Sequence, residues 1–217
     1  MLKALLDRAR PDIICIASLG FLLDADVLSV ARWGAYNLHP SLLPRYRGPF
    51  PWFWQYHDFV RDTGVTVHRL DVGEDTGPIA AQAPLNLEVG TDIRDAMNLA
   101  GTLGGHLMRK ALDDVQDEAA VLWDQDPAEG GPRARRVRRD ERFIHWDTWS
   151  LERVWHFMRG TYPWVDHFDR PDALRGRSYA VGGMSYGEPG GLPGTLVSAD
   201  GKFFVAHAEG HIRVFFK

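Results

Sequence analysis

Four prolines stand close together directly after a segment that is typical of a β-strand. The string N-L-H-P-S-L-L-P-R-Y-R-G-P-F-P spans residues 37–51 and contains Pro40, Pro44, Pro49 and Pro51. Proline has no backbone N–H to donate and restricts the residue before it, so neither a helix nor a sheet ladder continues through such a string. We therefore predict that the chain leaves regular structure at residue 40 and forms a long loop.

The segments before the loop alternate between helix-like and strand-like patterns. Residues 2–10 have the spacing of a short helix, and the apolar run at residues 13–17 predicts a buried parallel strand. A helix is expected over residues 22–31 and a second strand over residues 35–38. This order predicts an α/β sheet with crossover connections.

The segments after the loop continue the same domain. Residues 50–59 predict a helix with an aromatic face, and residues 64–71 and 79–85 predict two strands joined by the turn G-E-D-T-G-P. Thr91 is the expected N-cap of a long helix that ends near residue 114.

The composition of the chain changes at residues 126–142, D-P-A-E-G-G-P-R-A-R-R-V-R-R-D-E-R, where Pro and Gly precede six arginines. We predict a linker here, and the arginines form either a solvated segment or a basic patch for an anionic substrate such as RNA or a phosphorylated metabolite. Beyond it, Ser150 is expected to cap a helix, and the D-G pair at 200–201 predicts a hairpin in a small β-domain. The helix is expected to turn four side chains inward: Leu151, Val154, Trp155 and Met158.

Composition excludes several classes of protein. The chain has 217 residues, 45% of them apolar, without a run long enough to predict a membrane-spanning helix. Cys15 is the single cysteine and the first residues do not form a secretory signal, so we expect a cytoplasmic protein. The spacing of its histidines and its cysteine matches no metal-binding motif, so no metal is expected.

Three polar residues are candidates for chemistry. Asn37 and His39 are two apart at the end of a predicted strand, so both side chains point to the same side. Asp75 lies in a turn between two glycines. An amide, an imidazole and a carboxylate suit acyl transfer in which an amine attacks a carbonyl directly, although His39 could equally cap a loop.

Two strings carry a family resemblance. N-L-H-P-S-L-L-P-R-Y-R-G-P at 37–49 and G-V-T-V-H-R-L-D-V-G-E-D-T-G-P-I at 64–79 resemble the two halves of the signature of folate-dependent formyltransferases, especially the methionyl-tRNA formyltransferase branch. The resemblance implies formyl transfer from 10-formyltetrahydrofolate to a primary amine, with Asn37, His39 and Asp75 as the catalytic trio. It also implies folate contacts at Leu19, Gly20, Phe21, Leu22, Ser41, Leu42, Leu43 and Pro44, and we assign the amine acceptor to Arg45, Arg47 and Gly48.

The resemblance also covers the end of the chain. Residues 143–164 and 193–206 are similar to the opening helix and closing hairpin of the family's C-terminal domain, which implies an OB-like β-barrel. The expected organisation is a catalytic domain at 1–125 with a mostly parallel, Rossmann-like sheet, a linker at 126–142 and a β-domain at 143–217. Because the first motif stands later in the family, the sheet is expected to be shortened at its N-terminal side and to expose an edge strand. Either the start of the sequence is misassigned, or the chain pairs through that edge as a homodimer, or it is a shortened member of the family.

Other interpretations remain open. The acceptor is methionyl-tRNA or a small amine, such as a nucleotide-linked amino sugar or a modified amino acid. The arginines and aromatics at 45–57 also suit a non-catalytic RNA-binding protein or a degenerate homologue, unless the aromatics simply pack a helix onto the sheet. D-T-G at 75–77 occurs in aspartic proteases, which need two such aspartates. We interpret the other histidines, including His68, as structural or solvated.

Overall fold

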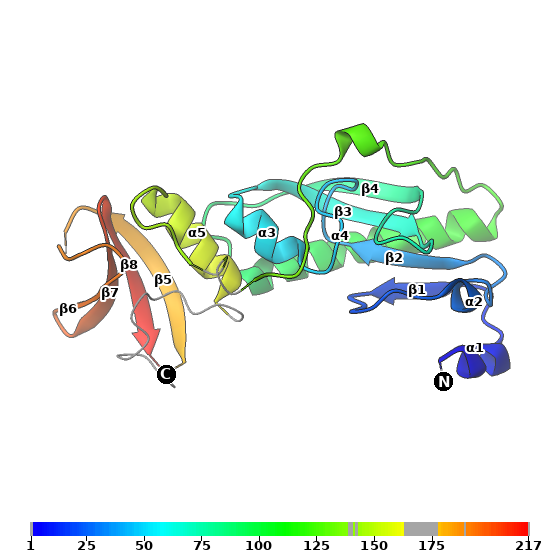
Figure 1. Ribbon diagram of the computed structural model, residues 1–217, viewed down its shortest axis with the longest axis horizontal. Helices are drawn as coiled ribbons and strands as arrows, with labels where there is room; N and C mark the ends of the chain where they lie inside the picture. The colour runs from blue at the N-terminus through cyan, green and yellow to red at the C-terminus, as the bar shows by residue number, and fades with distance from the viewer. Residues whose placement is uncertain (1, 139–140, 142, 163–177, 189, 217) are drawn as a thin grey trace. The chain divides into compact units, whose positions relative to one another are not determined.

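The computed structural model describes residues 2–138, 141, 143–162, 178–188 and 190–216 (Figure 1). The chain divides into two compact units. The first unit comprises Met1–Gln55, Arg61–Leu87 and Ala96–Arg136, and the second comprises Tyr56–Val60, Glu88–Asp95 and Val137–Lys217.

A mixed four-stranded sheet forms the centre of the first unit (Figure 1). Its strands lie in chain order: β1 (Ile14–Ala17), β2 (Ala35–His39), β3 (Asp62–Arg69) and β4 (Ile79–Asn86). β1 and β2 are parallel, whereas β2–β3 and β3–β4 are antiparallel. The prediction of a mostly parallel sheet is therefore wrong. A parallel partner needs a long crossover, whereas the turn after β3 returns the chain directly as an antiparallel neighbour.

The first part of the chain is less buried or less regular than the rest of the first unit. α1 (Leu2–Ala9) has no buried residue, and β1 alternates between half-buried and exposed positions. α2 (Ala25–Leu28) is shorter than the expected helix at 22–31, because residues 19–23 form part of a loop. β1 is an edge strand: among the described residues it pairs with β2 on one side only. The prediction of a buried strand at residues 13–17 was therefore wrong.

β3 is the best-buried strand of this sheet, with six of its eight residues buried. On one face, Val67 packs in a core with Tyr36 and with residues of α4 (Ile93–Gln116), which runs along the sheet in Figure 1. On the other face, the hydroxyl of Thr66 accepts the Leu43 N–H at 3.1 Å and donates to the Ser41 carbonyl at 2.7 Å. The proline-rich loop therefore covers β3 and is irregular, as predicted.

Two helices flank this arrangement. α3 (Pro51–His57) includes buried Phe53 and Trp54, so packing explains these aromatics. α4 begins after Asp92, whose carboxylate accepts the Arg94 N–H at 3.0 Å, so the expected cap at Thr91 is one residue early. The Thr91 hydroxyl instead donates to the Glu88 carbonyl.

The second unit contains α5 (Leu151–Thr161) and an antiparallel sheet. Ser150 caps α5 by accepting the Arg153 N–H, as predicted, and the expected inward side chains are buried except for the partly exposed Trp155. The sheet has the order β5-β8-β7-β6, with strands β5 (Tyr179–Tyr186), β6 (Leu196–Ala199), β7 (Lys202–His207) and β8 (Gly210–Phe216).

The predicted hairpin lies between β6 and β7, where Asp200 and Gly201 have φ of 49° and 69°. Positive φ at both positions is what a tight two-residue turn requires. The barrel prediction is corrected: the described strands form an open sheet, in which β5 and β6 are edges that do not pair with each other. Residues 163–177 of the predicted β-domain lie outside the described residues.

Candidate active site

The end of β2 and the neighbouring part of β3 bring polar side chains together. The antiparallel register pairs Asn37 with His68 and His39 with Thr66. Because residues two apart share one face of a strand, Asn37 and His39 address the same side of the sheet as predicted. Pro40 then directs the chain away from the sheet and leaves room beside both side chains.

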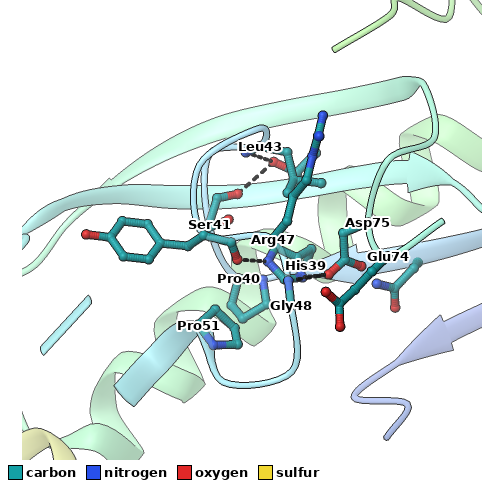
Figure 2. Close-up of polar contacts among 12 residues, drawn as sticks. His39, Pro40, Ser41, Leu43, Arg47, Gly48, Pro51, Glu74 and Asp75 are labelled. Atoms are coloured by element: carbon teal, nitrogen blue, oxygen red, sulfur yellow. Dashed lines mark hydrogen bonds and ion pairs between the residues drawn. The ribbon is translucent and has the colours of Figure 1, made fainter. Parts of the chain in front are cut away.

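Asp75 completes the trio from the turn between β3 and β4. It has a φ of 54°, and at the nearby Gly77 a Cβ atom would lie 1.8 Å from the Arg69 carbonyl oxygen, so the tight turn requires glycine there. One oxygen of the Asp75 carboxylate, Oδ2, accepts the Gly48 N–H at 2.9 Å and lies 3.5 Å from His39 Nδ1. Figure 2 shows this carboxylate pointing at the loop that carries Gly48, with Glu74 beside it.

His68 is a site residue that the sequence analysis missed. Its ring is fully buried, with Nε2 at 3.4 Å from Asp75 Oδ1 and at 3.2 Å from Asn37 Nδ2. It therefore connects the amide and the carboxylate of the trio. The signal was present in the second signature string, but it required pairing this strand with β2 in the correct register.

The electrostatics of the trio favour an ionised carboxylate and a neutral imidazole at neutral pH. Burial alone raises the pKa of Asp75, but His68, His39 and the Gly48 amide outweigh it and lower that pKa to about 2. Burial lowers the pKa of His39, against the opposing effects of Asp75 and the Tyr46 carbonyl.

The tautomer of His39 follows from its partners. Nε2 lies 2.9 Å from the Tyr46 carbonyl oxygen, which can only accept, so Nε2 carries the proton. Nδ1 of the neutral ring then presents its lone pair on the side of Asp75. A protonated ring would find an acceptor on both sides, so His39 is arranged to take up a proton.

A cavity of about 450 Å³ opens beside the trio within the first unit. Its volume is within the range of small-molecule sites. One part of its wall is apolar and includes Leu19, Phe21, Leu22, Leu23, Trp52 and Met97. The polar part includes the trio together with Asp71, Glu74 and Arg136.

The other predicted site residues divide between the cavity wall and its support. Leu19, Gly20, Phe21, Leu22 and Gly48 line the cavity. Ser41 and Leu43 are buried residues of the proline-rich loop, and together with Leu42 and Pro44 they lie outside the lining. Arg45 is exposed, and Arg47 donates two hydrogen bonds to Gln125.

The arginine run begins as an ordered segment against the proline-rich loop. The Ala134 N–H donates to the Arg47 carbonyl, and the Ala134 carbonyl accepts the Phe50 N–H, both at 2.8 Å. Arg133 pairs with Glu74, and Arg135 lies over the Trp54 ring. Residues 133–136 therefore contact the site's loop and are not a freely solvated linker.

Two further observations concern the described part of the chain. No helix in it is long and apolar enough to cross a membrane. It also contains no cluster of three or more His, Cys, Asp or Glu residues placed to hold a metal ion.

Comparison with known proteins identifies the family of this chain. Residues 1–112 match the model of the formyl transferase family, and the chain belongs to that family. It is 35% identical over 180 residues to the methionyl-tRNA formyltransferase of Anaeromyxobacter dehalogenans strain 2CP-C. That match covers 83% of this chain and 56% of the relative, so the chain spans little more than half of the relative's length.

Two solved structures share the fold. HypX from Aquifex aeolicus in complex with tetrahydrofolic acid matches 98% of this chain and 37% of its own, with a TM-score of 0.71 and 14% identity. WlaRD, a sugar 3N-formyl transferase solved with dTDP and 5-N-formyl-THF, matches 98% of this chain and 75% of its own, with a TM-score of 0.68 and 15% identity.

Proposed function

We propose that this chain transfers a formyl group from 10-formyltetrahydrofolate to a primary amine, with methionyl-tRNA as the acceptor. The observation that carries the proposal is the convergence of Asn37, His39 and Asp75 on one cavity. Membership of the formyl transferase family and the methionyl-tRNA formyltransferase relative support the same reaction.

The apolar wall of the cavity suits the folate donor. A flat pterin ring would lie against Leu19, Phe21 and Leu22, which line the cavity and are more than one-third exposed. The folate co-substrate supplies the formyl carbon. The tetrahydrofolate named in the structure of HypX supports a folate as the donor.

The amide and the imidazole act on the carbonyl oxygen. As the amine nitrogen forms a bond to the formyl carbon, the carbonyl π electrons move to the oxygen. Asn37 lines the cavity, and its side-chain amide offers an N–H to this oxyanion. His39 adds a positive charge beside the oxyanion once its ring is protonated.

The imidazole and the carboxylate move the proton. The attacking amine loses a proton, which His39 Nδ1 accepts, and the resulting imidazolium lies between the Tyr46 carbonyl and Asp75. When the bond from the formyl carbon to the folate nitrogen breaks, the leaving nitrogen keeps the electron pair and takes this proton. No covalent intermediate with the protein is needed.

A small amine is the second candidate acceptor. The sugar 3N-formyl transferase that shares the fold supports a nucleotide-linked amino sugar. Arg136 lines the cavity and Arg45 is exposed, so each offers a positive charge that suits the phosphates of either acceptor. Methionyl-tRNA is the preferred acceptor because the relative with 35% identity is named methionyl-tRNA formyltransferase.

A homodimer through β1 is part of the same proposal. The outer edge of β1 has no partner strand among the described residues, and Leu2 and Leu5 of α1 are exposed. An open edge offers backbone groups to a second copy. Light scattering during size-exclusion chromatography tests this: a mass of 24.5 kDa at micromolar concentration would contradict it.

The function is tested by following tetrahydrofolate release with methionyl-tRNA, a nucleotide-linked amino sugar or free methionine as acceptor. We expect release with methionyl-tRNA and its abolition in His39→Ala. Release with the sugar alone would establish the second candidate. Tight RNA binding without release, retained in His39→Ala, would instead establish the non-catalytic alternative.

A further inference from the structure

Gln125 lies outside both signature strings, yet its side chain joins the two loops that these strings form. It follows Trp123, which bridges to Ile79 at the start of β4, and it is 8% exposed. We propose that Gln125 is a positioning residue that fixes the Asp75 carboxylate against His39. This inference rests on the proposed formyl transfer.

Both ends of the Gln125 amide are fully used. Oε1 accepts Nε of Arg47 at 2.9 Å and Nη2 of Arg47 at 2.7 Å. Nε2 donates to the carbonyl of Asp75 at 2.9 Å and to that of Gly77 at 2.7 Å. A guanidinium only donates and a carbonyl only accepts, so the amide has one orientation that satisfies all four contacts.

The two loops joined by this amide are the ones that meet at the Asp75 carboxylate. Arg47 precedes Gly48, whose N–H donates to Asp75 Oδ2. On the other side, Asp75 has a positive φ that a non-glycine residue rarely adopts, and its own carbonyl is held by Gln125. Gln125 therefore holds the donor and the acceptor of the Gly48–Asp75 hydrogen bond from both sides.

Removing the amide would release this arrangement. The Gly77 carbonyl is buried and the guanidinium of Arg47 is partly buried, so both would lose partners that water replaces poorly. The turn could then relax from its positive φ, and Asp75 would move relative to His39 Nδ1. The effect of Gln125 on the reaction passes through Asp75, and Gln125 itself does not line the cavity.

Kinetics of Gln125→Ala and Gln125→Glu test the inference, with Gln116→Glu on the exposed end of α4 as the matched control. Glu is nearly isosteric with Gln and keeps the acceptor for Arg47, but it loses both donors to the turn. We expect kcat to fall about 10- to 100-fold in both Gln125 variants, because small displacements of catalytic groups are costly. The KM for 10-formyltetrahydrofolate and the rate of the control stay at the wild-type values.

Two readouts separate positioning from a general loss of structure. The acid limb of the pH profile of kcat/KM reports protonation of His39. It should move to lower pH in Gln125→Ala, because a more distant Asp75 stabilises the imidazolium less. The amide proton resonance of Gly48, measured by NMR without substrate, should move upfield as its bond to Asp75 lengthens.

The outcomes also separate this inference from the proposed function. Failure of the wild type to transfer a formyl group overturns the proposed function. In that case the Gly48 amide resonance, compared between the wild type and Gln125→Ala, still tests whether Gln125 holds the two loops together. An active wild type with unchanged kcat, pH profile and Gly48 resonance in the Gln125 variants overturns the positioning role. If Gln125→Ala does not fold, Gln125→Glu carries the same test.

Discussion

β1 and β3 belong to one sheet, but their surroundings differ. β3 lies between α4 and the proline-rich loop and buries six of its eight residues, whereas β1 alternates between half-buried and exposed positions. The trio and His68 lie on β2, on β3 and in the turn after β3. The loop after β1 supplies exposed apolar side chains to the cavity wall. The proposed reacting groups thus stand on the well-buried part of the sheet, and the proposed wall for the donor lies on its more exposed part.

The largest expected effect is on the rate of formyl transfer, when Asp75 in the turn after β3 is changed. Asp75→Asn removes the charge that stabilises the His39 imidazolium but keeps the shape of the side chain. We expect kcat to fall about 10³-fold, as when a preorganised electrostatic partner is removed. Single-turnover measurement of tetrahydrofolate release checks this. An activity within threefold (roughly 0.7 kcal/mol) of the wild type would remove Asp75 from the mechanism.

His68→Phe tests the buried ring on β3 that joins Asn37 to Asp75. Phe keeps a ring of similar size but offers no partner to the amide or the carboxylate. We expect kcat to fall about 10- to 100-fold, together with a loss of about 1–3 kcal/mol in the free energy of unfolding. His106→Phe, on an exposed position of α4, is the control and should change neither quantity. Equal effects in both variants would contradict the assignment.

Val67→Ala and Leu5→Ala compare the two regions by stability alone. Val67 is fully buried on β3, so its truncation should cost about 2 kcal/mol in the free energy of unfolding. Leu5 is 56% exposed on α1, and its truncation should cost less than about 0.5 kcal/mol. Urea denaturation measures both values. A larger cost at Leu5 would show that the region around β1 is more tightly packed than described.

At the cavity wall, the smallest effect on the reaction is expected. Phe21 is 62% exposed, so Phe21→Ala should leave stability and kcat unchanged and raise the KM for 10-formyltetrahydrofolate about fivefold. Phe215→Ala, at a 47% exposed position in the second unit, is the control and should not change that KM. An unchanged KM in Phe21→Ala would mean that the donor does not use this wall.

The proline-rich loop and the common face of Asn37 and His39 were predictable because their signals are local, whereas the grouping of Asp75 with them came from the family resemblance. Prolines at fixed positions end β2, and the two-residue spacing of Asn37 and His39 sets their common face. His68 and Gln125 were not predictable in this way, because their partners are distant in sequence. A histidine in a strand or a glutamine in a polar loop gives no sign of its role until the β2–β3 register and the path of the chain after α4 are known.

The same limit explains the errors in sheet architecture. Local patterns predicted strands at β1 to β4 and at the β6–β7 hairpin, but strand direction and edge pairing depend on long-range contacts. The buried character of residues 13–17 was overestimated because an apolar run does not reveal whether its strand is central or at an edge.

Transfer of an isotopically labelled formyl group tests the central claim most directly. The protein is mixed with labelled 10-formyltetrahydrofolate and methionyl-tRNA, and the label is located at the end of the reaction. The account predicts one N-formylmethionyl-tRNA formed for each tetrahydrofolate released, with transfer abolished in Asp75→Asn. Label recovered as free formate, or transfer that persists in Asp75→Asn, would contradict it.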